Sequence, residues 1–135
     1  MYISKVQVRV RYADTDRMGY LYHGHYPAYY EIGRTEALRN IGIIYKELED
    51  SGIMMPVIEM NIKYIKPVHY DTLLTIETLV NELPEVRIKF NYKLLNEDNV
   101  LMNEAKTILI FFDSQKQKPC RVPDNVLNQL KQYFG

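Results

Sequence analysis

The chain joins one long helical pattern to an almost unbroken succession of strand-like segments, and this combination constrains its fold most. Between residues 30 and 41, apolar residues recur at steps of three and four, which predicts a helix with one buried stripe. The stripe consists of Tyr30, Gly33, Ala37 and Ile41. We expect the helix to begin between His23 and Pro27, because proline is tolerated in the first helical turn. It should end at Asn40 or Ile41, before Gly42.

Strand patterns occupy most of the remaining chain. Near the N-terminus, Val6, Val8 and Val10 alternate with polar residues, with the period of two expected of a half-buried strand. From Met54 onward, further strand-like segments are separated by turn residues. These segments are Val57–Ile65, Leu73–Leu83, Val86–Leu95 and Leu101–Phe112. Their order predicts an α+β protein in which one antiparallel sheet of about five strands wraps around one central helix.

Three further features refine this outline. Gly33 lies in the middle of the long helix, where glycine costs about 1 kcal/mol relative to alanine, so either the helix packs closely against the sheet there or the glycine is simply tolerated. A short helix is expected from Tyr45 to Asp50, ended by Gly52. A closing helix should open at Pro123, with an apolar side formed by Val126, Leu127, Leu130 and Phe134.

Length and charge exclude several classes of protein. A chain of 135 residues predicts one domain, residues 1–135. Seventeen basic residues balance seventeen acidic ones, so no global field attracts nucleic acid or an anionic membrane, and an anionic ligand must be held locally. No apolar run approaches the roughly 20 residues of a membrane-spanning helix. The lone Cys120 and the polar, alternating N-terminus predict a cytoplasmic protein.

The segment between the first strand and the long helix carries the residues best suited to chemistry. It places Asp14 and Asp16 in a polar, irregular loop that ends where the helix begins. The first backbone N–H groups of a helix lack intrahelical partners, so they can polarise a thioester carbonyl as its oxygen gains negative charge. A carboxylate opposite that carbonyl can activate water or attack directly.

Other roles for these side chains stay open on spacing alone. Asp14 and Asp16 have the residue type and position to satisfy backbone N–H groups of a turn or a helix cap. His23 and His25 lie two residues apart and, together with the two aspartates, form an alternative set of metal ligands.

At these residues the sequence resembles a known family. The stretch R-Y-A-D-T-D-R-M-G-Y-L-Y-H-G-H-Y-P-A-Y-Y-E-I-G-R-T-E, Arg11 to Glu36, is similar to the signature of the 4-hydroxybenzoyl-CoA thioesterase family. These are hotdog-fold acyl-CoA thioesterases, and the likeness is strongest to their Tol-Pal-associated branch. A second stretch, Tyr70 to Thr78, looks like the family's entry into its third strand. The resemblance therefore implies a single hotdog domain.

The resemblance also implies roles for individual residues. Asp16, the second aspartate of D-T-D, matches the family's catalytic carboxylate, which acts as nucleophile or as base on water. His23 matches the position whose backbone N–H polarises the thioester carbonyl, with a lesser role for its side chain. Gly19 would keep the loop tight beneath the thioester. Tyr22 would line the acyl tunnel, or else pack in the core.

One departure from the family concerns the acyl carrier. Members that hydrolyse the hydroxybenzoyl ester carry a basic cluster for the phosphates of coenzyme A just after the third strand, whereas this chain reads Glu82-Leu83-Pro84-Glu85 there. The basic residues that could replace it are Lys116, Lys118 and Arg121, or Arg87 and Lys89. The carrier is therefore either coenzyme A or an acyl carrier protein.

Three hypotheses follow. The first is a thioesterase without metal or redox cofactor that hydrolyses acyl-CoA or acyl-carrier thioesters between the subunits of a homodimer or homotetramer. The second is a hotdog dehydratase on acyl-carrier substrates, which needs a histidine and a helix-borne acid such as His23 and Glu31. The third is a non-catalytic protein that binds acyl thioesters.

Overall fold

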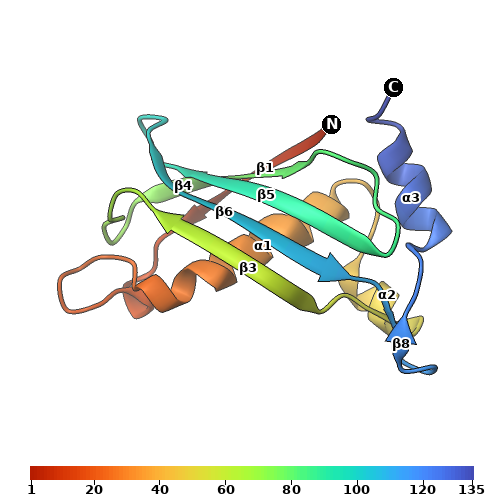
Figure 1. Ribbon diagram of the computed structural model, residues 1–135. Coiled ribbons are helices and arrows are strands. Elements are labelled where there is room, and N and C mark those ends of the chain that lie inside the picture. The colour runs from red at the N-terminus through yellow and green to blue at the C-terminus, as the bar shows by residue number, and fades with distance from the viewer.

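A computed structural model describes residues 1–135 and shows one five-stranded antiparallel sheet curved around a central helix (Figure 1). The helix, α1 (Tyr26–Arg39), lies across one face of the sheet. The strands follow the order β1-β4-β5-β6-β3. Their bounds are β1 Tyr2–Arg9, β3 Val57–Tyr64, β4 Leu73–Val80, β5 Arg87–Leu95 and β6 Leu101–Ile110. The predicted α+β architecture is confirmed.

The element boundaries agree with the sequence patterns to within a few residues. The predicted helix start is confirmed, because a short 3-10 turn, η2 (His23–His25), leads directly into α1. The predicted strand to Leu83 is too long, since β4 ends at Val80 where Pro84 and its neighbours turn the chain. The predicted strand to Phe112 is divided, because β6 ends at Ile110 and the next residues join a second sheet.

The second sheet is small and was not predicted. It pairs β2 (Ile53–Met54), β7 (Phe112–Asp113) and β8 (Lys118–Pro119). Strands of two residues leave too short a pattern of alternation to read from a sequence. Both predicted short helices are present, as α2 (Tyr45–Asp50) and α3 (Asp124–Lys131). None of the helices combines the length and the apolar character needed to cross a membrane.

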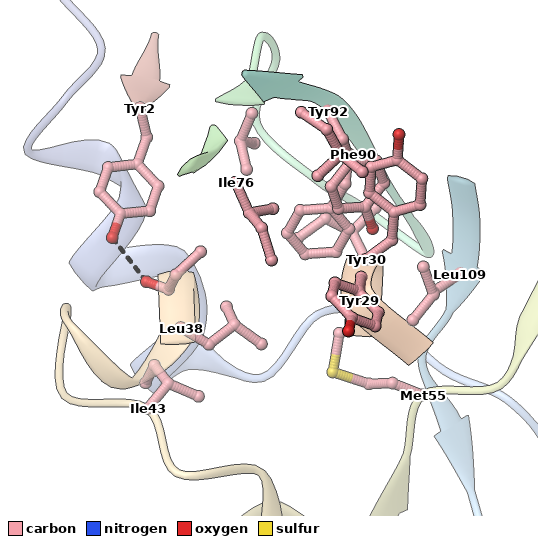
Figure 2. Close-up of a cluster of buried hydrophobic side chains, with 14 of the residues drawn as sticks. Tyr2, Tyr29, Tyr30, Leu38, Ile43, Met55, Ile76, Phe90, Tyr92 and Leu109 are labelled. Carbon is pink, nitrogen blue, oxygen red and sulfur yellow. Dashed lines mark hydrogen bonds between the residues drawn. The ribbon is translucent and has the colours of Figure 1, made fainter. Parts of the chain in front are cut away.

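The core lies between α1 and the inner face of the sheet (Figure 2). The four residues of the predicted helical stripe are all buried. Facing them are inward side chains of the sheet that include Ile76, Phe90 and Leu109. Most tyrosines of this core have a hydrogen-bond partner for the hydroxyl, as when Tyr30 donates to Asn103 and Tyr2 donates to the carbonyl of Ala37.

Gly33 marks the point of closest approach between α1 and the sheet. A Cβ at this position would lie 2.7 Å from the Cγ2 of Ile76 and 2.7 Å from the Oγ1 of Thr78, both on β4. Of the two interpretations of this glycine, close packing against the sheet is therefore confirmed. Any side chain here would push the helix away from β4.

We predict that Gly33→Ala destabilises the protein by about 1–3 kcal/mol, because overpacking outweighs the gain in helix propensity. The free energy of unfolding by denaturant measures this change. The reverse substitution at an exposed position of the same helix, Ala28→Gly, supplies the ordinary difference of about 1 kcal/mol between the two residues. A more stable Gly33→Ala protein would contradict the close approach.

Candidate active site

The loop before α1 folds into a tight turn around Asp16. The backbone N–H of Asp16 donates to the carbonyl of Tyr20 at 2.8 Å. Thr15 and Leu21, which flank these two residues, pair with each other in an isolated antiparallel β-bridge. Gly19 closes this turn with a φ of 82°, a left-handed conformation that favours glycine, and its N–H donates to the carbonyl of Asp16 at 3.1 Å. The predicted role of Gly19 in keeping the loop tight thus has a backbone basis.

The turn is fastened to the segment that follows β3. The N–H of Leu21 donates to the carbonyl of Val68 at 2.7 Å, and the N–H of Tyr70 donates to that of Gly19 at 2.8 Å. The rings of Tyr20 and His69 lie 4.6 Å apart between these two bonds. The position of Asp16 is therefore set by two stretches of chain that are distant in sequence.

Asp14 anchors the base of the loop. It is buried, and its Oδ2 accepts a hydrogen bond from the Tyr29 hydroxyl at 2.8 Å while its two oxygens also accept from Arg11 at 3.3 and 3.2 Å. The carbonyl of Asp14 accepts the N–H of Tyr22 at 2.9 Å, immediately before η2. Burial raises the pKa of the Asp14 carboxyl, but the bonds from Arg11 and Tyr29 together outweigh burial and hold the pKa below its ordinary value.

Asp16 differs from Asp14 in keeping half of its carboxylate free. Its side chain is exposed, and Oδ1 accepts the N–H groups of Met18 at 2.9 Å and of Tyr20 at 3.2 Å. No hydrogen bond from the protein reaches Oδ2. The expected turn-stabilising role of both aspartates is thus present, and in Asp16 it orients a carboxylate whose second oxygen stays available.

His23 occupies the first position of η2, at the entrance to α1. The N–H groups of Tyr22 and His25 are bonded to the carbonyls of Asp14 and Tyr22, whereas the N–H of His23 has no such partner. This agrees with the general lack of intrahelical partners at a helix start. The carbonyl of His23 is held by the Tyr64 hydroxyl at 2.9 Å.

Asp16 and His23 line one pocket of about 260 Å³. The other residues of its wall are Tyr20, Leu21, Tyr26, Tyr64, Ile65, Lys66 and Pro67. Gly19 and Tyr22 are outside this wall. The Tyr22 side chain is 43% exposed and lies with its ring 4.3 Å from that of His23 and 5.6 Å from that of His25, so the interpretation of Tyr22 as a core residue is wrong.

The sequence patterns missed the wall that the end of β3 contributes. Tyr64 packs edge-on against Tyr26 with ring centroids 5.0 Å apart, and Lys66 follows at the rim. Burial, together with the nearby Tyr64 and Asp16, raises the pKa of Tyr26 to about 12. Tyr26 therefore stays a neutral phenol beside the carboxylate. The sequence marked this segment only as the end of the predicted strand Val57–Ile65 and the turn Lys66-Pro67, with no sign of a role in the site.

The other proposed sets of side chains are not brought together. No three histidine, cysteine or acidic side chains are arranged to hold a metal ion, and the Asp14 carboxylate is occupied by Arg11 and Tyr29. Glu31 is exposed and lines a different hollow with Arg34 and Tyr45, so it does not share a pocket with His23.

The chain is similar to several known proteins. A family profile described as "Thioesterase-like superfamily" matches residues 10–130. The putative acyl-CoA thioesterase YneP of Bacillus subtilis is 34% identical over 119 residues, which are 88% of this chain and 86% of that protein. The acyl-CoA thioester hydrolase YbgC of Escherichia coli is 34% identical over 125 residues, or 93% of each chain. The crystal structure of a DHNA-CoA thioesterase from Staphylococcus aureus has a TM-score of 0.85 at 31% identity and covers 99% of this chain and 85% of that one.

We predict that Asp14→Asn lowers the free energy of unfolding at pH 7 by about 1–3 kcal/mol, because a neutral amide replaces the charged acceptor of Arg11 and Tyr29. The pKa of Asp14 is lowered in the folded protein, so its contribution is present above the ordinary carboxyl pKa and is lost as the pH falls through the folded value. The difference between wild type and variant should therefore shrink below about pH 4. Denaturant unfolding at pH 7 and pH 3 checks this, with exposed Asp50→Asn as the control. An equal difference at both pH values would contradict it.

Proposed function

Because the chain belongs to the thioesterase-like superfamily and is a thioesterase, we propose that it hydrolyses acyl-CoA thioesters at the Asp16 pocket. Asp16 acts as general base or nucleophile, and the N–H of His23 donates to the oxyanion. The observation that carries the proposal is that Asp16 keeps one carboxylate oxygen free of protein hydrogen bonds in a pocket that is also lined by His23, the first residue of the turn that leads into α1.

The proposed reaction uses each of these groups once. Either Asp16 removes a proton from a water molecule that attacks the thioester carbon, or the free oxygen of Asp16 attacks that carbon itself and water then cleaves the resulting anhydride. In both routes the carbonyl oxygen gains negative charge beside the His23 N–H. The carbon–sulfur bond breaks and the sulfur leaves as a thiolate, which needs no strong acid because a thiol has a pKa of about 8.5.

The apolar part of the pocket wall favours this chemistry. Leu21, Tyr26 and Pro67 give it apolar surface, and Asp16 and His23 belong to the same wall. A less polar surrounding strengthens the interaction between a helix N-terminus and a developing oxyanion. The Tyr64 hydroxyl, bound to the His23 carbonyl, fixes the peptide next to the donor N–H.

We predict that Asp16→Asn lowers kcat about 10²- to 10⁴-fold, because the amide can neither accept the proton nor attack. The release of free thiol from acyl-CoAs ranging from acetyl through palmitoyl and benzoyl measures this loss. Asp50→Asn, an exposed carboxylate change on α2, is the matched control and should keep wild-type activity. A kcat of Asp16→Asn equal to that of the wild type would show that Asp16 has no role in the reaction.

The same experiment separates the two other hypotheses. A non-catalytic binding protein would release no thiol in its wild-type form, and Asp16→Asn would leave its affinity for the thioester largely intact. A dehydratase would leave the thioester bond in place and change the acyl chain. The separation of Glu31 from the His23 pocket speaks against the dehydratase.

We also propose that two copies of the chain join along β3. This strand is at an edge of the sheet, and its large apolar side chains are exposed: Val57 by 40%, Ile58 by 49% and Tyr64 by 51%. An edge strand with unpaired backbone groups and apolar side chains is a template for pairing with another strand. Because Tyr64 also lines the pocket, the partner subunit would complete the site.

We predict that the wild-type protein has at least twice the mass of the chain in solution and that Ile58→Lys shifts it toward monomer with loss of activity. A lysine at this position places a charge in the expected interface, which costs binding energy. Ile3→Lys, on the opposite edge strand β1 with a side chain 45% exposed, is the matched control and should stay oligomeric. Light scattering after size-exclusion chromatography gives the mass. A monomeric wild-type protein would contradict the proposed interface along β3.

A further inference from the structure

Thioester hydrolysis changes the charge at three places, and the groups assigned so far serve two of them. Asp16 activates water or attacks the acyl carbon, and the N–H of His23 is the proposed donor to the carbonyl oxygen. The third place is the sulfur atom, which keeps the electron pair of the broken carbon–sulfur bond and becomes negative. A preorganised positive group at this atom would lower the barrier to its departure.

Most polar side chains of the pocket wall are unsuited to this task. The Tyr64 hydroxyl already donates to the carbonyl of His23 at 2.9 Å. Burial raises the pKa of Tyr26 to about 12, so this side chain is a neutral phenol. The ring of His23 lies 4.3 Å from the ring of Tyr22, which is outside the wall. Lys66 is the only lysine or arginine among the residues that line the pocket.

Lys66 has no acidic partner within the chain. Its side chain is exposed, and none of the ion pairs of the protein includes it. It lines the same wall as Asp16 without forming a salt bridge with it, which leaves room between the two groups for a substrate. The ammonium group of a lysine is a compact charge on a flexible stem, so it can follow a sulfur atom as that atom moves away.

The backbone on either side of Lys66 is fastened to the rest of the site. Its own N–H donates to the carbonyl of Met102 at 2.9 Å. Two residues earlier, the Tyr64 hydroxyl binds the carbonyl of His23, and two residues later a carbonyl accepts the N–H of Leu21 at 2.7 Å. Figure 1 shows the end of β3 at the same end of the molecule as the loop before α1. The ammonium group therefore moves on its stem while its backbone stays in place.

The pocket is small, which keeps these groups close to one substrate. Its volume of about 260 Å³ equals that of about nine water molecules at roughly 30 Å³ each. A thioester and the attacking water fill much of this space. A sulfur atom held there lies within reach of a lysine stem that starts at the wall.

We propose that Lys66 is a further catalytic residue, whose ammonium group stabilises the negative charge on the sulfur as the carbon–sulfur bond breaks. The inference rests on the proposed thioesterase function and adds the group that receives the leaving thiolate. One water molecule supplies both the hydroxyl that ends on the acyl carbon and the proton that ends on the sulfur, so Lys66 keeps its own proton throughout. Hydrogen bonds between charged groups are stronger than those between neutral groups, and this one forms only as the bond breaks.

The test compares two thioesters of the same acyl group that carry no phosphate, one of N-acetylcysteamine and one of thiophenol. Thiophenol is the more acidic thiol and spreads the charge of its thiolate into the ring, so its departure depends less on a positive neighbour. We expect Lys66→Gln to lower kcat about tenfold for the N-acetylcysteamine thioester and less than about threefold for the thiophenol thioester. The KM for either substrate should change little. The release of free thiol measures both constants.

Three controls accompany this comparison. Lys66→Arg keeps the positive charge and should recover most of the kcat that Lys66→Gln loses. Lys46→Gln, the same change at an exposed lysine of α2, is the matched control and should keep both kcat values of the wild type. The mass of Lys66→Gln in solution should equal that of the wild type, because Lys66 lies beyond the end of β3. This last measurement separates an effect on the leaving group from a loss of the proposed interface.

Several results would overturn the inference. An equal loss of kcat for both thioesters, or no loss for either, would show that Lys66 does not meet the charge on the sulfur. A higher KM for acyl-CoA alone, with both phosphate-free thioesters unaffected, would assign Lys66 to binding of the carrier instead. A Lys66→Arg protein no more active than Lys66→Gln would show that the charge is not what matters. The proposed function fails separately, if the wild-type protein hydrolyses none of these thioesters.

Discussion

The close packing of α1 against the sheet is the constraint on which the rest of the structure depends. At Gly33 the absence of a side chain lets the helix backbone approach Ile76 and Thr78 of β4 more closely than any other residue would allow. This contact fixes the height of the helix above the sheet, and the buried stripe around it fixes its rotation. The start of α1, and with it the position of the His23 N–H, follows from these two restraints.

The loop that holds Asp16 is then tied to the helix by one buried carboxylate. Asp14 bonds to Tyr29 on α1 through its side chain and to Tyr22 through its carbonyl, so the loop on one side and η2 on the other share an anchor. Asp16 sits only two residues beyond that anchor, in a turn whose N–H groups hold one of its oxygens. The two aspartates of one short motif thus have different roles: Asp14 holds the loop in place, and Asp16 faces the pocket.

Strand β3 links the local site to the proposed interface with a second copy. Its exposed apolar side chains suit it to pair with a second copy, and its inward Tyr64 supports the His23 peptide. A single edge strand can serve both purposes because successive side chains point to opposite faces while the backbone stays open on one side. Substitutions along β3 are therefore expected to affect association and turnover together.

The sequence by itself determined the elements and the chemical character of the loop. Apolar patterning marked α1 and the five long strands, turn-forming residues marked the loop around Asp16, and the resemblance of its D-T-D motif to a known family singled out Asp16 itself. These features are local, because helix and strand periods and turn-forming residues act within a few residues of each other. The tertiary structure decided which distant side chains meet. Tyr64 and Lys66 reach the pocket and Tyr22 stays outside the core, because strand register and helix packing bring together residues that no spacing in the sequence relates.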